Sequence, residues 1–202
     1  MGHTDRPGKL VLISTTAVYG ETGVAVVTED RPPNPLTARG KRRLDAERTL
    51  LQWGAEHGVP VVILRVAGIY GRGRIPFEKI RARHPLLDER EAPCTNMIHA
   101  EDLARICWAA GEKGEAGEIF NVSDGQPRSM TSYFNAVTDL LGLPRLPQVG
   151  LEEARRVMEP LMFSYMTEGK RIDNGRLLKR LGIKLLYPTL EEGLRAVLDE
   201  EE

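Results

Sequence analysis

Lys9-Leu-Val-Leu-Ile-Ser14, which runs directly into Thr15-Thr-Ala-Val-Tyr-Gly20, is the stretch that decides the fold of this chain. Its apolar residues follow one another without alternation, which is typical of a parallel strand covered on both faces. The strand ends in a cluster of hydroxyls, and open α/β sheets bind ligands at the carboxyl ends of their strands. We therefore expect the functional site beside Ser14 and Thr15.

A helix and a second buried strand follow this first strand. Asn34-Pro35 predicts the helix start, with proline at the first helical position, and Gly58 predicts its end. Apolar residues recur at helical spacing between these two signals. Val59-Pro-Val-Val-Ile-Leu-Arg65 then reads as a second buried strand, so that strand, helix and strand form one right-handed βαβ unit with parallel strands.

The remainder of the chain is predicted to be mainly helical. The expected elements are a short helix over 75–83, a helix over 102–110, a strand over 118–122, a helix over 131–141, partly helical structure over 151–167 and a helix over 174–181. Thr131 is the expected cap of its helix. Thr189-x-x-Glu192 has the spacing of a capping box that opens the final helix.

Six groups of residues occur in an order and spacing typical of one protein family. They are Ser14-Thr15-Thr16 with Val18-Tyr19-Gly20, Glu29 with Pro35, Glu47, Leu64-Arg65 with Tyr70-Gly71, Ile98-His99-Ala-Glu-Asp102 with Ala104, and Phe120-Asn121-Val-Ser-Asp124. In these landmarks the chain resembles the extended short-chain dehydrogenase/reductases and, within them, the NAD-dependent epimerase/dehydratase family. The resemblance implies an α/β fold, a truncated Rossmann-like doubly wound parallel sheet with a small α-rich substrate-side lobe, in a single domain over residues 1–202.

The expected truncation concerns the cofactor-binding part of this family. Its first half carries a Gly-rich loop that presents backbone N–H groups to the cofactor pyrophosphate. Met1 precedes the first strand by only a few residues, so we expect that portion to be missing from this chain. Gly68-Ile-Tyr-Gly-Arg-Gly73 follows a strand, but its order is GxxGxG and no acidic strand end follows, which argues against its being that loop.

The family reaction also needs a tyrosine whose phenol exchanges a proton with the substrate and a lysine one helical turn later. If Glu47 is taken as the anchor, Arg39 and Arg43 stand at those two positions. If the lysine is taken as the anchor, Thr37 and Lys41 stand there. Neither register contains a tyrosine. Of the catalytic residues that the resemblance implies, only Thr15 and a cation are therefore present.

The resemblance implies a set of site residues around the two strand ends. The catalytic candidates are Thr15 and Tyr19; the cofactor-binding candidates are Ser14, Lys41, Arg43, Arg65 and Gly68; the substrate-binding candidates are Tyr70, Arg72, Arg74, Asn96 and His99. Structural alternatives remain open: a hydroxyl bonded to the backbone for Thr15, wall positions for the tyrosines, and cap or turn positions for His99 and Asp102. The implied cofactor is NAD or NADP, and the implied partner is a small-molecule substrate.

Composition limits the functional classes and the cellular location that we expect for this chain. A chain of 202 residues with 41% hydrophobic content can bury one core. A net charge of −1 gives no general attraction to nucleic acid, and 5% aromatic residues give little surface for base stacking. Two cysteines and the lack of a long apolar run predict a cytoplasmic protein without a membrane segment. The four histidines and two cysteines show no metal-ligand spacing, so no metal site is expected.

Three functional hypotheses remain open. The first is an NAD(P)-dependent epimerase/dehydratase-like oxidoreductase that acts on a small hydroxylated or nucleotide-linked substrate. The second is a catalytically degenerate relative that works as a ligand-binding or protein-interaction module, and the third is a truncated gene product. Loss of the first strands exposes an apolar sheet edge, so we expect marginal stability or a homo-oligomer formed through that edge or the crossover helix.

Overall fold

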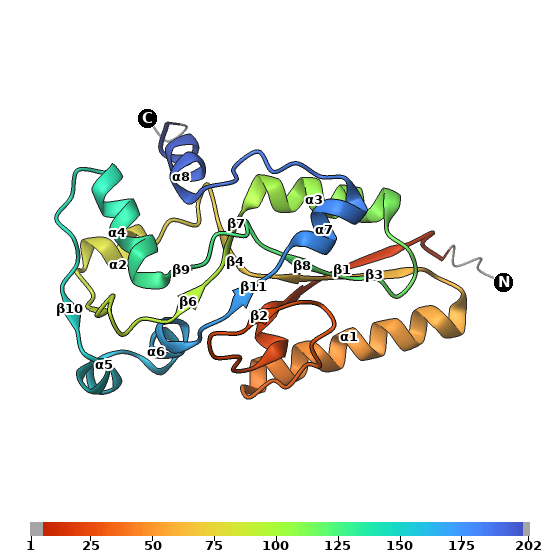
Figure 1. Ribbon diagram of the computed structural model, residues 1–202, viewed down its shortest axis with the longest axis horizontal. Helices are drawn as coiled ribbons and strands as arrows, with labels where there is room; N and C mark the ends of the chain where they lie inside the picture. The colour runs from red at the N-terminus through yellow and green to blue at the C-terminus, as the bar shows by residue number, and fades with distance from the viewer. Residues whose placement is uncertain (1–5, 200–202) are drawn as a thin grey trace.

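A three-stranded parallel sheet in the order β1-β3-β8 forms the centre of the fold (Figure 1). The computed structural model describes residues 6–199. β1 (Leu10–Thr15) pairs with β3 (Val61–Val66), and β3 pairs in turn with β8 (Ile119–Val122), both in parallel. The register places Ser14 opposite Arg65. The predicted βαβ unit with two adjacent parallel strands is therefore confirmed.

Helices cover both faces of this sheet, as the doubly wound fold requires. α1 (Ala38–His57) lies below the sheet in Figure 1, whereas α3 (Ala100–Lys113) and α7 (Gly175–Leu181) lie above it. The even-numbered residues of β3 pack with Ile106 of α3 and Leu177 of α7 in one apolar cluster. We call the sheet with these three helices the sheet lobe.

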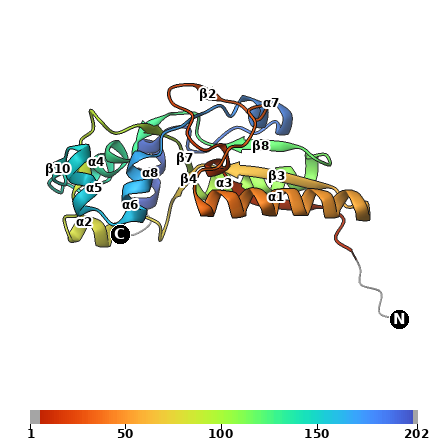
Figure 2. The ribbon, with the colours of Figure 1, turned by 90° about the horizontal axis from the view of Figure 1, so that it is seen from below.

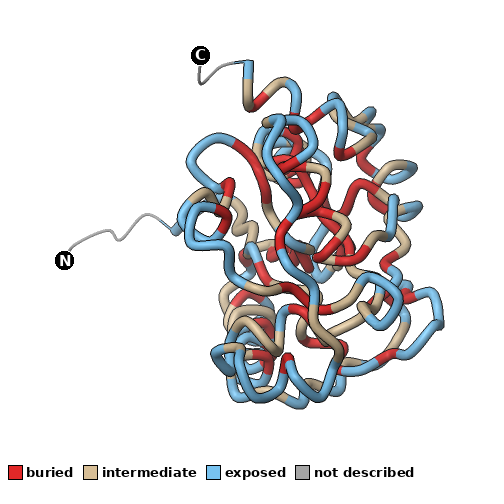
Figure 3. Tube along the Cα trace, turned by 90° about the vertical axis from the view of Figure 1, so that its left-hand side faces the viewer, coloured by how far each residue is buried: buried red, intermediate tan, exposed pale blue. Residues whose placement is uncertain are grey.

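The second part of the molecule, the helical lobe, is built mainly from short helices. They are α2 (Phe77–Arg81), α4 (Met130–Leu140), α5 (Leu151–Val157), α6 (Pro160–Thr167) and α8 (Leu190–Asp199). Figure 2 shows these five helices gathered beside the sheet lobe. Their shared core includes Leu86, Phe134 and Leu194, and Figure 3 shows buried segments running through the interior of the molecule.

Short strand pairs and one 3-10 helix connect these parts. The 3-10 helix is η1 (Thr16–Tyr19). The pairs are β2 (Val26–Val27) with β11 (Arg171–Ile172), β4 (Gly68–Tyr70) with β7 (Met97–His99), β5 (Leu86–Leu87) with β10 (Gln148–Val149), and β6 (Cys94–Thr95) with β9 (Arg128–Ser129). The β2–β11 pair joins segments far apart in the sequence, and it brings the end of α6 toward the carboxyl end of β1.

One expectation about β1 is wrong. β3 is buried along its whole length, but β1 is only partly buried and Ile13 is 45% exposed. The difference follows from the strand order, because β1 has a single neighbour and lies at the edge of the described sheet. The apolar edge that the sequence predicts is therefore present.

Two predicted helix starts are also shifted. α1 begins at Ala38 instead of at Pro35, because the Thr37 hydroxyl accepts a hydrogen bond from Gly40 N at 3.1 Å and so caps the first turn. α4 is capped by Ser129, whose hydroxyl accepts from Ser132 N at 2.9 Å. Thr131 lies inside that helix, and its hydroxyl donates to Leu87 O at 2.6 Å.

Two predicted helix signals are confirmed. Gly58 ends α1 in the left-handed region, with φ of +67°, and its N–H donates to Gly54 O. Thr189 and Glu192 form the expected capping box, because the N–H of each residue donates to the side chain of the other. Each of these two signals depends on residues close together in the sequence, so both could be predicted from the sequence alone.

Candidate functional site

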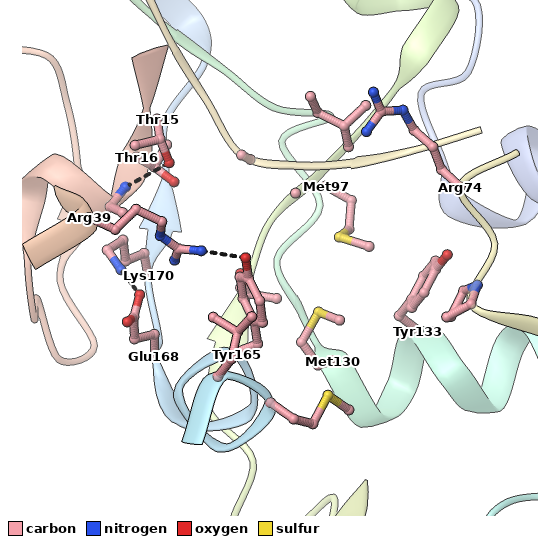
Figure 4. Close-up of a pocket in the computed structure, with 18 of the residues that line it drawn as sticks. Thr15, Thr16, Arg39, Arg74, Met97, Met130, Tyr133, Tyr165, Glu168 and Lys170 are labelled. Carbon is pink, nitrogen blue, oxygen red and sulfur yellow. Dashed lines mark hydrogen bonds and ion pairs between the residues drawn. The ribbon is translucent and has the colours of Figure 1, made fainter. Parts of the chain in front are cut away.

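A cavity of about 630 Å³ opens where β1 and β3 end, between the sheet lobe and the helical lobe (Figure 4). Segments of both lobes line it, and its volume lies within the range of small-molecule sites. The lining residues used below are Thr15, Thr16, Arg39, Arg43, Gly68, Arg74, Lys79, Met97, Met130, Tyr133, Tyr165, Glu168 and Lys170. The predicted location of the site, at the carboxyl ends of parallel strands, coincides with this cavity.

Thr15 has the structural role that the sequence left open and lies where the functional one would require it. Its hydroxyl accepts a hydrogen bond from Ala17 N at 3.2 Å and thereby caps the 3-10 helix η1. The residue also lines the cavity, together with Thr16. A threonine hydroxyl that accepts one hydrogen bond still has a proton to donate, so Thr15 remains able to bind a ligand.

The orientation of α1 settles which helix residues face the cavity. Arg39 and Arg43, one helical turn apart, both line it. Glu47, one turn further, is buried. Lys41 is exposed on α1 and lies beside a shallow surface recess instead, while Thr37 serves as the N-cap. The register anchored on Glu47, which has arginines where the resemblance implies tyrosine and lysine, is therefore the one whose two residues both line the cavity.

Glu47 fixes the position of α1 against the sheet through a buried hydrogen-bond network behind the cavity. Its carboxylate accepts from Arg65 Nη2 at 2.8 Å and Nε at 3.2 Å, and also from the Ser14 hydroxyl. The Arg65 guanidinium lies 4.9 Å from the ring centroid of Tyr19. Ser14 and Arg65, expected to bind cofactor, are thus engaged in joining α1 to β1 and β3, and neither lines the cavity.

Tyr19 also lies outside the cavity. It is 1% exposed, and its hydroxyl donates to Asn121 Oδ1 at 2.8 Å. Burial raises the pKa of this phenol above its usual value, against the opposing effect of Arg65. A buried, hydrogen-bonded phenol with a raised pKa is placed for packing and not for proton exchange with a ligand.

Among the substrate-binding candidates, only Arg74 lines the cavity, and Arg72 is exposed outside it. Asn96 is buried and its Oδ1 accepts from Ile172 N at 2.8 Å. His99 caps α3, because its Nδ1 accepts from Glu101 N at 3.3 Å. Tyr70 is fully buried, with its ring centroid 5.2 Å from that of His99.

The glycine-containing segment after β3 does not form a phosphate-binding loop. Its first three residues form the strand β4, and Gly68 N donates to Asn96 O at 3.0 Å. A strand whose N–H groups are used in this way has fewer free donors to offer a pyrophosphate. Gly68 nevertheless lines the cavity, where a side chain would meet Met97 Sδ at 2.7 Å.

Three cavity residues, Tyr165, Glu168 and Lys170, come from α6 and the segment directly after it, where the sequence analysis proposed no site residue. Tyr165 of α6 accepts a hydrogen bond from Arg39 Nη1, and its ring lies 4.8 Å from the Arg39 guanidinium carbon. Lys170 is 7% exposed and lies 3.6 Å from Glu168, and burial lowers the pKa of this lysine. No local motif marks these residues, because the β2–β11 pairing is what brings them to the cavity.

Asp124, outside the cavity, gives the protein a stability that depends on pH. Burial raises the pKa of Asp124 to about 6 from its usual 3.8. Between about pH 4 and pH 6 the carboxyl is therefore protonated in the folded chain and ionised in the unfolded chain. The free energy of unfolding should fall by roughly 2 kcal/mol as pH rises through that window, and Asp124→Asn should remove this slope.

Urea unfolding at a series of pH values measures this effect. Asp139→Asn is the matched control, because Arg145 lowers the pKa of that exposed carboxyl and its contribution is lost only as pH falls. Parallel curves for the unchanged protein and Asp124→Asn between pH 4 and pH 6 would contradict the expected role of Asp124.

Within residues 6–199, no group of three or more His, Cys, Asp or Glu side chains is arranged to hold a metal ion. Over the same residues, the helices include none with the length and apolar character needed to cross a membrane.

Comparison with known proteins places this chain among known folds and families. A family model described as "NAD dependent epimerase/dehydratase family" matches residues 2–123. Protein YeeZ of Escherichia coli strain K12 is 27% identical over 186 residues, which cover 89% of this chain and 59% of that protein. UDP-glucose 4-epimerase of Corynebacterium glutamicum is 30% identical over 159 residues, which cover 67% of this chain and 48% of that enzyme.

Solved structures share the fold over most of the chain. A functionally unknown conserved protein from Silicibacter pomeroyi has a TM-score of 0.83 at 34% identity, covering 94% of this chain and 66% of its own. dTDP-glucose 4,6-dehydratase from Bacillus anthracis, solved in complex with NAD, has a TM-score of 0.76 at 20% identity, covering 95% and 60%. This chain thus spans about half to two thirds of the length of these relatives, and with the family model matching more than half of its residues, it belongs to the NAD-dependent epimerase/dehydratase family.

Proposed function

We propose that this chain acts as an NAD(P)-dependent oxidoreductase of the epimerase/dehydratase type on a small hydroxylated or nucleotide-linked substrate. The observation that carries the proposal is the meeting of Thr15 and Thr16 with Arg39 and Arg43 in one cavity at the ends of β1 and β3. Ligands bind at this place in open α/β sheets. The names of the relatives, UDP-glucose 4-epimerase among them, support a nucleotide-linked substrate.

Arg43 fits one end of a nicotinamide cofactor. It stands four residues before Glu47, where the resemblance implies the lysine that holds the nicotinamide ribose, and its Nη1 donates to Ile13 O at 3.4 Å. The remaining guanidinium N–H groups can donate to ribose hydroxyls or to a phosphate. Gly68–Tyr70, which follows β3, is paired with β7, so the fit that we propose concerns the ribose end alone.

The chain's own residues bind and orient in this proposal. Bound NAD(P) supplies the acceptor or donor of a hydride. The Thr15 and Thr16 hydroxyls hold a substrate hydroxyl or carbonyl, while Met97 and Met130 form an apolar wall that limits the access of water. The Arg39 guanidinium offers several N–H donors and no acceptor, so its role here is to bind and orient the ligand.

Titration of the protein with NADH and NADPH, followed by cofactor fluorescence, tests the proposal. We expect saturable binding of at least one cofactor, weakened about tenfold by Arg43→Gln through the loss of charge-assisted hydrogen bonds. Arg42→Gln is the matched control, because Arg42 is an exposed neighbour on α1 that does not line the cavity. Absence of binding at millimolar cofactor, or equal weakening in both variants, would overturn the proposal.

A further inference from the structure

We propose that the cavity binds its ligand through an oxyanion, a carboxylate or a phosphate group, placed beside Arg39, Arg43 and Lys170. This inference rests on the proposed function in taking the cavity as the ligand site, and it adds the chemical class of the group held there. The ligand is then a small acidic hydroxy compound and not a neutral one. Its anionic group lies next to Thr15 and Thr16, at the end of β1.

The first observation is a local excess of positive charge. Five cations line the cavity, namely Arg39, Arg43, Arg74, Lys79 and Lys170, whereas Glu168 is the one carboxylate among the lining residues. The chain as a whole has a net charge of −1, so composition does not account for this excess. A concave surface lined by one sign of charge concentrates ligands of the opposite sign.

The second observation is that most of these cations lack an acidic partner. Within residues 6–199, Arg39, Arg43, Arg74 and Lys79 have no carboxylate oxygen within 4.0 Å. Other described arginines, such as Arg42 and Arg48, also form no ion pair, but they lie on the exposed surface of α1 and do not line this cavity. Glu168 is already engaged, because Lys170 lies 3.6 Å away and the Ser164 hydroxyl donates to it at 2.6 Å.

The third observation is the position of Arg39 itself. Figure 4 shows its guanidinium extending from α1 toward Tyr165, near Lys170 and Glu168. Tyr165 accepts a hydrogen bond from Arg39, so its own O–H proton remains available for a ligand oxygen. Arg39 lies in the first turn of α1, where the partial positive charge of the helix end adds to that of the side chain.

Lys170 lines the same cavity as Arg39 and is 7% exposed. Burial lowers the pKa of its ammonium, Glu168 raises it, and the charge of Arg39 lowers it by a smaller amount. Two cations that repel one another in a partly buried setting are stabilised when an anion binds beside both. A neutral ligand leaves the repulsion in place.

Apolar side chains beyond the cations can contact the rest of the ligand. Figure 4 shows Met97, Met130 and Tyr133 further into the cavity, and Arg74 beyond them on the side away from Arg39. Tyr133 is 3% exposed, and burial raises the pKa of its phenol, so it presents a neutral ring. The cavity thus has Arg39, Arg43 and Lys170 on one side, Arg74 on the other, and apolar groups between them, which suits a small molecule whose acidic group lies beside Arg39.

Isothermal titration calorimetry at low ionic strength, with no cofactor present, tests this inference. The probes are glucuronate, glucose and inorganic phosphate; glucuronate differs from glucose in a carboxylate in place of one hydroxymethyl group. We expect glucuronate or phosphate to bind and glucose not to bind. Arg39→Gln and Arg43→Gln should each weaken the binding by about tenfold, whereas Arg42→Gln should change it by less than about twofold. Unchanged melting temperatures verify that the variants fold.

The outcomes separate the two anion types and the two proposals. Binding of glucuronate alone indicates a carboxylate ligand, binding of phosphate alone indicates a phosphorylated one, and binding of both supports the shared oxyanion site. Equal affinity for glucose and glucuronate, equal weakening in Arg39→Gln and Arg42→Gln, or no binding of either anion overturns the inference. Because no cofactor is added, failure of NAD(P)H binding with oxyanion binding intact would count against the proposed function alone.

Discussion

Replacing Glu47 with alanine is expected to lower the free energy of unfolding by about 3–5 kcal/mol, because it leaves a buried guanidinium without its partner. Arg65 and Glu47 are each almost fully buried, with side-chain exposures of 4% and 2%. The Ser14 hydroxyl loses its acceptor in the same change. Chemical denaturation followed by circular dichroism measures the loss.

Two further variants make this prediction specific. Glu56→Ala removes an exposed carboxylate from the same helix, where its contact is with Gln52, and should change stability by less than about 0.5 kcal/mol. Glu47→Leu combined with Arg65→Met replaces the whole pair by apolar groups and should recover much of the loss. A cost below 1 kcal/mol for Glu47→Ala would show that the buried pair does not fix α1.

Replacing Gly193 with alanine is expected to cost about 3 kcal/mol, although alanine normally favours a helix. A β-carbon at this position of α8 would meet Tyr70 Oη at 2.1 Å and Cζ at 2.8 Å. Tyr70 is fully buried against His99 and Tyr133, so its ring has little room to shift. Overpacking of this kind outweighs the gain in helix propensity.

Gly111→Ala is the matched control for this prediction. Gly111 also lies in a helix, α3, but a β-carbon there meets no atom within 4 Å. Its replacement should stabilise the protein by about 0.5–1 kcal/mol. Tyr70→Phe should partly rescue Gly193→Ala, because it removes the nearest clashing atom. Equal effects of the two glycine replacements in thermal unfolding would contradict the close approach of α8 to Tyr70.

The sequence predicted those parts of the fold that depend on neighbouring residues. The unbroken apolar run over β3 indicated a strand buried on both faces, and Gly58 marked the end of α1 with a left-handed residue. The same run over β1 indicated full burial that the structure does not show, because strand order decides which strand lies at the edge. Apolar patterning reports what a strand can bury and not which neighbours it has.

The candidate site was only partly predictable. Of the residues that the sequence proposed for catalysis or binding, Thr15, Arg43, Gly68 and Arg74 line the cavity, and Arg39 lines it with them. Their roles remain predictions. Arg65 carries a charge at a strand end, which resembles a ligand-binding residue in the sequence, yet its partner is an acid on α1 that only the packing reveals. Lys170 reaches the cavity through long-range pairing, which no local pattern encodes.

The exposed edge of β1 bears on the expected self-association. Ile13 is 45% exposed there, and the strand has one paired neighbour among the described residues. Association through this edge or through α1 remains a prediction. Sedimentation velocity over a range of protein concentrations should show a dimer or larger species, and replacement of Ile13 by lysine should shift the distribution toward monomer.

An NMR titration of the ¹⁵N-labelled protein with NADH shows directly whether ligands bind where β1 and β3 end. Amide shifts should change at Thr15, Thr16, Arg43 and Gly68, and Arg43→Gln should suppress these changes. Shift changes confined to the surface recess around Glu29, Arg176 and Arg180, or spread evenly over the chain, would contradict binding at these strand ends.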